Sequence, residues 1–228
     1  MIIDESIIHK NKIAGITIVV YSDDNIINKI KKMIREFEIR YPKELLNKLQ
    51  YHFVKDTDSF KLEVLNEISK FNIMSYSVII NCDKDMKIKE LYENNLNNLL
   101  KPILKKYEKI RYYSFELDFE NLTEKYQKDK EFILKTLSKD NFIAERIQNK
   151  SIIINIIKKE NFLTILPDYI MGAILFFLKS KNKEPGSFAR MQIEKIKKCI
   201  SQVNLSLEGN LQWYDFKKQS RYDDFMKL

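Results

Sequence analysis

The chain has 228 residues, of which 44% are hydrophobic, and its 40 Lys and Arg exceed its 32 Asp and Glu to give a formal net charge of +8 at pH 7. This length suits one large domain, or one domain with an appendage, and the apolar fraction is enough for a packed core, which excludes an intrinsically disordered chain. The 4 Gly and 4 Pro also exclude collagen-like and linker-rich chains.

The positive charge has two explanations. Surplus Lys and Arg are typical of proteins that bind phosphate polymers. Only 6 of the 40 cations are arginine, however, and Ile, Lys and Asn dominate the chain, which is the composition that an A/T-rich coding sequence produces without selection for binding. The charge alone leaves both explanations open.

Cysteine usage and the N-terminal residues predict a cytoplasmic protein. Cys82 and Cys199 are far apart and match no metal spacing or disulfide framework, and acids stand where a signal peptide needs basic residues. The one membrane-like segment, 162–178, has 17 residues where about 20 are needed to span a bilayer. It also contains Asp168. We therefore expect a buried helix and no membrane association.

The first half of the chain alternates strand-like and helix-like segments. Runs rich in β-branched residues predict a hairpin from 1–6 and 12–21. Apolar residues at helical spacing then predict a helix that is capped by Asp23 or Asp24 and ends before Pro42. The polar side of this helix is basic and holds Lys29, Lys31, Lys32, Arg35 and Arg40. A short helix, a brief strand, a longer helix and a strand follow at 43–49, 50–55, 58–70 and 72–81.

The second half continues this alternation. A helix interrupted by Pro102, a strand, a helix and a strand are expected at 88–107, 109–119, 124–138 and 151–158. The buried helix, a linker with a Pro-Gly pair and an amphipathic helix follow at 162–180, 181–187 and 188–201. The last 25 or so residues form a polar tail that contains aromatic side chains.

This order of elements predicts an α/β fold. Strands separated by helices indicate a central sheet, and the first hairpin adds an antiparallel part. We predict a mixed central sheet with helices on both faces. Residues 1–182 form this domain, and residues 183–228 form a C-terminal helical extension packed on or near the core.

Acidic residues adjoin three of the apolar elements. Asp4 and Glu5 end the first strand, and Glu116 and Asp118, near the end of a later strand, share one face by alternation. Asp168 lies inside the apolar helix, where a lone carboxylate needs a partner, a metal ion or an exposed helix face. Carboxylates that come together often share a divalent cation, and two such ions about 3.5 to 4 Å apart can hydrolyse phosphodiesters.

Each acidic site has a structural alternative. Solvated side chains explain Glu5 and Glu116 equally well, and capping or pairing with a lysine explains Asp168. His52 could shuttle protons near such a site, but a histidine between two aromatic residues is more often packed or at the surface. The tail combines aromatic and basic residues that could bind nucleic acid, and packing on the core is the favoured explanation. These residues are Trp213, Tyr214, Phe216, Lys217, Lys218, Arg221 and Tyr222.

Four short motifs follow one another along residues 1 to 180. The first is Asp4-Glu5-Ser6, which ends a strand and precedes Ile7. The others are His52-Phe53 before a helix, Asp118 at a strand end, and residues 164–173, in which Asp168 precedes small and apolar residues.

This series resembles the domain of unknown function 3800 family, whose opening strand ends in Asp-Glu-Ser-Gly and whose closing motif ends in Asp before a small-residue apolar helix. The resemblance implies an RNase H-like fold. It also implies that Asp4, Asp118 and Asp168 are metal ligands for Mg²⁺ or Mn²⁺, with Glu5 or Glu116 as an auxiliary acid. The chain departs from the family pattern in having Ile for the Gly of the first motif and Pro in the last motif.

The leading hypothesis is therefore a metal-dependent nuclease, or a related phosphoryl-transfer enzyme, that acts on DNA or RNA. The alternative is a non-catalytic module of the same fold that binds nucleic acid or another protein. A structural, oligomer-forming protein is the third hypothesis, so a protein partner or a homo-oligomer stays open.

Overall fold

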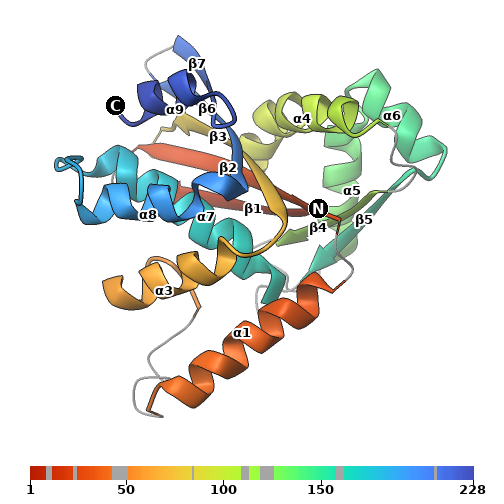
Figure 1. The fold of residues 1–228 in the computed structure, drawn as a ribbon. Coiled ribbons are helices and arrows are strands. Elements are labelled where there is room, and N and C mark those ends of the chain that lie inside the picture. The colour runs from red at the N-terminus through yellow and green to blue at the C-terminus, as the bar shows by residue number, and fades with distance from the viewer. Residues whose placement is uncertain are drawn as a thin grey trace. The chain divides into compact units, whose positions relative to one another are not determined.

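The computed structural model describes residues 1–8, 12–22, 25–42, 51–83, 85–108, 113–118, 126–157, 162–207 and 210–228. Helices and strands alternate along these residues, so the fold is α/β as predicted (Figure 1). The seven described strands are β1 (Ile2–Ile8), β2 (Ile13–Tyr21), β3 (Ile73–Asn81), β4 (Tyr113–Asp118), β5 (Ile152–Ile157), β6 (Ile200–Leu207) and β7 (Asn210–Asp215). They form one sheet in the order β5-β4-β1-β2-β3-β6-β7.

The sheet is mixed. β4 is parallel to both of its neighbours, β1 and β5. β2 and β3 are antiparallel, because the amide of Cys82 donates to the carbonyl of Lys12 at 2.8 Å while the hydroxyls of Thr17 and Ser77 lie 2.8 Å apart further along the pair. The interior of β2 is buried throughout, as expected for an apolar strand with neighbours on both sides.

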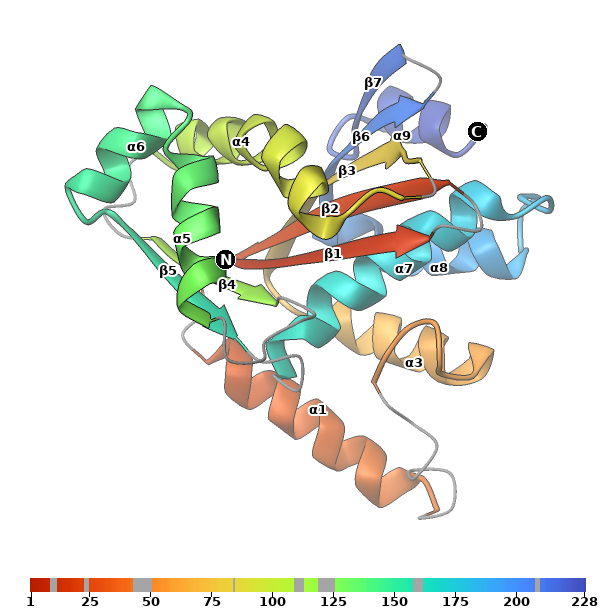
Figure 2. The same cartoon turned by 180° about the vertical axis from the view of Figure 1, so that it is seen from behind.

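The chain divides into two compact units, and both contain parts of the central strands. The first unit comprises Met1–Ile18, Tyr76–Asn161 and Asn204–Gln212. Its helices are α4 (Ile88–Lys106), α5 (Tyr126–Leu137) and α6 (Asn141–Gln148). These helices contact one another, and α5 and α6 also contact β5 (Figure 2).

The second unit comprises Val19–Ser75, Phe162–Val203 and Trp213–Leu228. Its helical elements are α1 (Ile26–Arg40), α3 (Asp58–Ile68), η2 (Phe162–Thr164), α7 (Ile165–Lys179), α8 (Phe188–Ile196), η3 (Lys197–Cys199) and α9 (Gln219–Phe225). α3, α7 and α8 lie side by side, and η2 contacts both α1 and α7 (Figure 1).

A strand was predicted at 50–55, but residues 51–55, the part that the structure describes, do not form a strand. Residues 51–57 form turns, and the amides of Lys55 and Asp56 both donate to the carbonyl of His52 at 3.0 Å. A carbonyl that closes a turn in this way is not part of a strand ladder. The predicted helix at 43–49 lies outside the described residues.

Helix boundaries differ from the predictions in three places. Asn25, rather than an aspartate, occupies the N-cap position of α1, and Asp23 and Asp24 lie outside the described residues. α4 continues through Pro102 instead of breaking there. α6 was not predicted, and Asp140 caps it by accepting hydrogen bonds from two backbone amides.

The C-terminal residues are not the helical extension that the sequence suggested. α8 ends at Ile196, and β6 and β7 follow before α9. The amide of Phe216 donates to the carbonyl of Ser201 at 3.0 Å, which sets the two strands antiparallel. Tyr214, Phe216 and Tyr222 are buried, so packing is confirmed for these three aromatic residues, whereas Trp213 is exposed.

Among the described residues, one segment, Phe162–Lys179, is long and apolar enough to cross a membrane by length and composition, and 67% of it is buried inside the protein. A core helix passes the same test. The ten buried residues of α7 match the predicted buried helix.

Candidate functional site

Asp4 and Asp118 lie on adjacent strands. In the parallel pair of β1 and β4, Ile2 is opposite Glu116 and Ile3 is opposite Leu117. The next residue on each strand is an aspartate, so this register brings the backbones of Asp4 and Asp118 side by side, roughly one strand spacing of 4.8 Å apart. Residues 114 positions apart in sequence thus meet in the first unit.

Glu5 is held by a helix of the same unit. The hydroxyl of Tyr92, a fully buried residue of α4, donates to Oε2 of Glu5 at 2.5 Å. The amide of Glu5 in turn donates to Oδ1 of Asp4 at 2.9 Å. A charge-assisted bond of this length orients the carboxylate, which distinguishes Glu5 from a freely solvated acid.

Asp168 receives a loop that is distant in sequence. Its Oδ2 accepts a hydrogen bond from the amide of Phe53 at 2.7 Å and lies 3.6 Å from Nδ1 of His52. The second separation is beyond hydrogen-bond distance, and this buried nitrogen has no hydrogen-bond partner among the described residues. A backbone amide is thus one partner of this partly buried carboxylate, and the two motifs at His52-Phe53 and Asp168 contact each other within the second unit.

A second carboxylate, that of Asp56, also forms hydrogen bonds that hold the loop at His52-Phe53 in place. Asp56 is 5% exposed, and its Oδ2 accepts from the amide of His52 at 3.0 Å and from the hydroxyl of Tyr169. Burial and the neighbouring Asp56 carboxylate raise the pKa of Tyr169, so its hydroxyl stays protonated and donates. The ring of Phe53 packs edge-on against Tyr169, with centroids 5.7 Å apart.

Gly172 makes room for this loop on α7. A Cβ built on it would lie 2.2 Å from Cγ and 2.7 Å from Cβ of Phe53. Side-chain atoms never approach so closely, so any larger residue would displace Phe53 or the helix. Pro167, the departure in the closing motif, lies in the first turn of α7, where its missing N–H has no helical partner to lose.

The predicted site residues thus fall into two groups. Asp4, Glu5, Glu116 and Asp118 belong to the first unit, and Asp168 belongs to the second. Among the described side chains, no group of three or more His, Cys, Asp or Glu lies close enough to hold a metal ion. The structure describes only the backbone of Glu116 and Asp118, so the carboxylates of these two residues are not among the side chains considered.

Sequence reasoning missed four residues around these sites. They are Asp56, Tyr92, Tyr169 and Gly172. Tyr169 and Gly172 lie within the motif at 164–173, but the role of each of the four residues depends on a contact at least 87 positions away in sequence. Gly172 is one of four glycines and lies inside an apolar helix. A glycine in such a position often marks a close approach of another segment to the helix, so the sequence alone could have indicated this contact.

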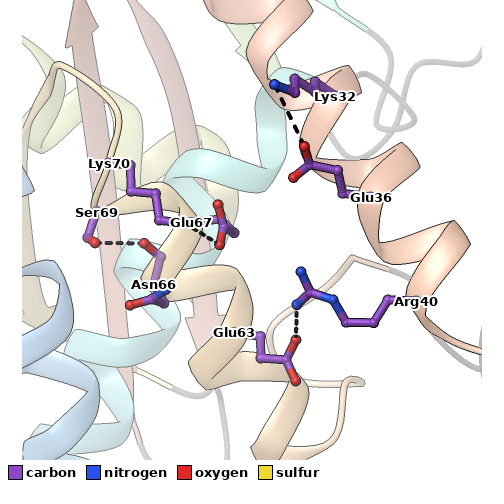
Figure 3. A network of polar contacts seen from close by, with 8 residues as sticks. All are labelled: Lys32, Glu36, Arg40, Glu63, Asn66, Glu67, Ser69 and Lys70. Carbon is purple, nitrogen blue, oxygen red and sulfur yellow. Dashed lines mark hydrogen bonds and ion pairs between the residues drawn. The ribbon is translucent and has the colours of Figure 1, made fainter.

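The basic face of α1 is partly neutralised. Lys32 lies 3.8 Å from Glu36, and Arg40 lies 2.9 Å from Glu63 of α3 (Figure 3). The hydroxyl of Tyr41 also donates to Glu63, and together with burial this interaction raises the pKa of Tyr41 to about 12. The contacts of Arg40 and Tyr41 with Glu63 join α1 to α3, and the two ion pairs lower the net charge of this face.

The two cysteines are buried and unpaired, as predicted. Burial raises the pKa of the Cys199 thiol to about 11, and its Sγ donates to the carbonyl of Ile68 at 3.6 Å. A buried thiol with a raised pKa is a poor nucleophile, so it does not support cysteine-based catalysis.

No protein-family model matches the chain. No curated protein matches it either.

Proposed function

We propose that the chain is a metal-dependent nuclease, or a related phosphoryl-transfer enzyme, with an RNase H-like fold that acts on DNA or RNA in the cytoplasm. The observation that carries the proposal is the register of β1 and β4, which continues to an aspartate on each strand. Aspartates opposite each other on two neighbouring strands suit hard divalent cations such as Mg²⁺ and Mn²⁺, which prefer oxygen ligands.

The strand order gives further support. The five strands β5-β4-β1-β2-β3 combine an antiparallel pair, β2 and β3, with a parallel group, β1, β4 and β5. This is the mixed central sheet that the resemblance to the domain of unknown function 3800 family implies. Helices on both faces of that sheet are part of the same proposal.

In this proposal Asp4 and Asp118 are metal ligands, and Glu5, oriented by Tyr92, is the auxiliary acid. Asp168 is assigned as the third ligand on the resemblance alone, and its bond from the amide of Phe53 fixes the position of one oxygen. Bound metal ions would supply activation of water and stabilisation of the leaving oxygen in phosphodiester hydrolysis. The bond that forms joins the water oxygen to phosphorus, and the bond that breaks joins phosphorus to a sugar oxygen.

Substitution Asp4→Asn tests the proposal. The amide keeps the shape of the side chain but loses the charge, so cleavage of labelled DNA and RNA in the presence of Mn²⁺ should fall by at least about 100-fold. Circular dichroism should show an unchanged fold. Asp83→Asn, the same change at an exposed position of the same unit, is the matched control and should cleave like the unmodified chain.

Two outcomes would contradict the assignment. Unchanged cleavage by Asp4→Asn would remove Asp4 from the site. Binding of nucleic acid without Mn²⁺-dependent cleavage by the unmodified chain would instead support the non-catalytic alternative.

A further inference from the structure

Five lysines lie on two segments of the second unit that are distant in sequence and contact each other. Lys195, Lys197 and Lys198 lie at the end of α8 and in η3, and Lys217 and Lys218 lie between β7 and α9. We call these five residues the lysine corner. The antiparallel bond from the amide of Phe216 to the carbonyl of Ser201 holds the two segments together.

Neutral groups hold two of these lysines in place. Nζ of Lys217 donates to the carbonyl of Lys198 at 3.1 Å. Nζ of Lys197 donates to Oε1 of Gln219 at 2.9 Å and lies 3.7 Å from the centre of the Tyr222 ring. A carbonyl, an amide and an aromatic ring fix the positions of the ammonium groups without cancelling their charge.

Nearby carboxylates are engaged elsewhere. Oδ1 of Asp215 accepts from the backbone amide of Lys217 at 2.9 Å, and Glu194 pairs with Arg190 at 3.0 Å. Oδ1 of Asp223 accepts from the side-chain amide of Gln219 at 2.7 Å. In the part of the chain that the structure describes, no lysine of the corner has a carboxylate within 4.0 Å.

Helix electrostatics account for three of the five lysines of the corner. The partial negative charge at the end of α8 favours Lys195 and the lysines of η3. Lys217 and Lys218 precede α9, whose N-terminal end disfavours cations and whose first turn has no acid. Helix electrostatics therefore leave the positions of Lys217 and Lys218 unexplained.

We propose that the lysine corner binds the phosphate backbone of nucleic acid. This inference rests on the proposed function, which supplies the substrate class. Lysines are point-charge partners of phosphate, and several held together neutralise consecutive phosphates with release of counterions. The basic face of α1 is a poorer surface because Lys32 and Arg40 already have carboxylate partners (Figure 3).

Nucleic acid fits the corner better than an anionic membrane. A surface that inserts into a bilayer combines cations with exposed apolar side chains. None of the large exposed hydrophobic residues among the described side chains lies within 195–198 or 217–221.

The test compares two triple variants of the full chain. Lys195→Gln/Lys198→Gln/Lys218→Gln removes three exposed charges of the corner whose side chains make no hydrogen bond or ion pair in the described part of the chain. Lys128→Gln/Lys135→Gln/Lys181→Gln is the matched control, with the same loss of charge at exposed positions elsewhere. Circular dichroism and thermal unfolding should show both variants folded.

Binding is measured in EDTA, so that it does not depend on any metal site. The probes are fluorescein-labelled single-stranded DNA, duplex DNA and single-stranded RNA of about 30 nucleotides, followed by anisotropy over a salt series. The corner variant should bind at least one of these probes about 10-fold or more weakly at about 100 mM salt, with a salt slope lowered by about 0.7 to 0.9 for each lost phosphate contact. The control variant should stay within about 2-fold of the unmodified chain. Trp213, the one tryptophan of the chain, lies four residues before Lys217 and gives an independent fluorescence signal.

Three outcomes would overturn the lysine corner. They are equal weakening by both variants, no binding of any probe by the unmodified chain, and binding of vesicles containing phosphatidylserine in place of nucleic acid. Failure of the nuclease proposal has a separate signature. It would appear as absent cleavage in Mn²⁺ while the corner variant still loses binding in EDTA.

Discussion

Replacing Gly172 by alanine would change the free energy of unfolding through two effects of opposite sign. In a helix interior, replacing Gly by Ala ordinarily stabilises a protein by roughly 1 kcal/mol because the unfolded chain loses freedom. Here the added methyl would overlap Phe53 at 2.2 Å. Such overpacking costs about 1 to 3 kcal/mol, so the clash should outweigh the gain in helix propensity.

We therefore expect Gly172→Ala to lower the free energy of unfolding by up to about 2 kcal/mol, measured by urea denaturation. Phe53→Ala removes Cγ and Cδ1, the two Phe53 atoms nearest to the added methyl, so the effect of Gly172→Ala should shrink in that background. Additive effects of the two substitutions would show that the methyl group and the ring do not compete for space.

Asp140, the N-cap residue of α6, makes the stability of the fold depend on pH. The hydrogen bond from Lys101, at 2.7 Å, is the largest cause that lowers the pKa of this carboxyl below its ordinary value of 3.8. The amides of Phe142 and Ile143 also donate to it, at 3.0 and 3.2 Å. Because the folded pKa lies below the unfolded pKa, the stabilisation is fully present above about pH 4 and is lost as the pH falls through the folded value.

Asp140→Asn keeps a capping oxygen but removes the charge, so it should cost about 0.5 kcal/mol of unfolding free energy at pH 7. Asp140→Ala also removes the cap and should cost about 1 kcal/mol more. Urea denaturation at pH 7 and near pH 3 checks the sign. The gap between the unmodified chain and Asp140→Asn should narrow at the lower pH, and a widening gap would contradict the direction of the pKa shift.

At the scale of elements, the turn at 52–56 depends on side chains rather than on a strand ladder. The amides of His52 and Phe53 donate to the carboxylates of Asp56 and Asp168. Tyr169 completes the arrangement by donating to Asp56. The turn is thus fastened to the first turn of α7, and its position should respond to loss of any of these bonds.

Tyr169→Phe removes a donor from a carboxylate that is 5% exposed, so it should lower the unfolding free energy by about 1.5 to 3 kcal/mol. Hydrogen exchange of a peptide covering 52–56 should become faster. Tyr51→Phe is the matched control, because among the described residues the hydroxyl of Tyr51 donates only a long hydrogen bond, 3.5 Å, to the carbonyl of Ile34. Equal effects of the two substitutions would show that the bond to Asp56 does not hold the turn.

α4 shows a different balance between local and tertiary effects. A proline inside a helix costs about 3 kcal/mol through a lost hydrogen bond and a clash with the preceding turn. Around Pro102, however, Leu99, Leu100, Ile103 and Leu104 are buried. Each buried aliphatic side chain contributes roughly 1.5 to 3 kcal/mol, so their combined burial outweighs the cost of the proline.

At the scale of the whole molecule, the basic residues behind the net charge of +8 differ in what their charged groups contact. On α1, Lys32 and Arg40 lie beside Glu36 and Glu63, so this part of the surplus is neutralised within the fold. In the lysine corner, the ammonium groups are held by neutral acceptors. Composition explains how many lysines there are, whereas their arrangement bears on whether the chain binds a polyanion.

The sequence by itself determined most of the element order. Runs such as 13–21, 73–81 and 152–157 are apolar and β-branched, and helical spacing marked α1, α3 and α7. These patterns are local, because side chains repeat every 2 residues in a strand and every 3.6 in a helix. The first strand was predictable for the same reason, but Asp4 and Glu5 were expected to end it, whereas β1 continues to Ile8 and both acids lie inside the strand.

The weaker elements were not predictable in this way. β6 has polar residues such as Ser201 and Asn204 buried among its apolar ones, so its pattern does not alternate clearly. Residues 51–55 have a strand-like composition, but carboxylates at positions 56 and 168 satisfy two of their amides. In both cases tertiary contacts decide the local structure.

Only the tertiary structure decided which distant residues meet. The pairing of β1 with β4 brings Asp4 beside Asp118, and the packing of the 52–56 turn on α7 brings His52 and Phe53 to Asp168. Gly172 and Tyr92 owe their roles to the same long-range packing. Local periodicity specifies strands and helices, but strand register and side-chain packing depend on contacts between residues far apart in the chain, and those contacts assemble the candidate sites.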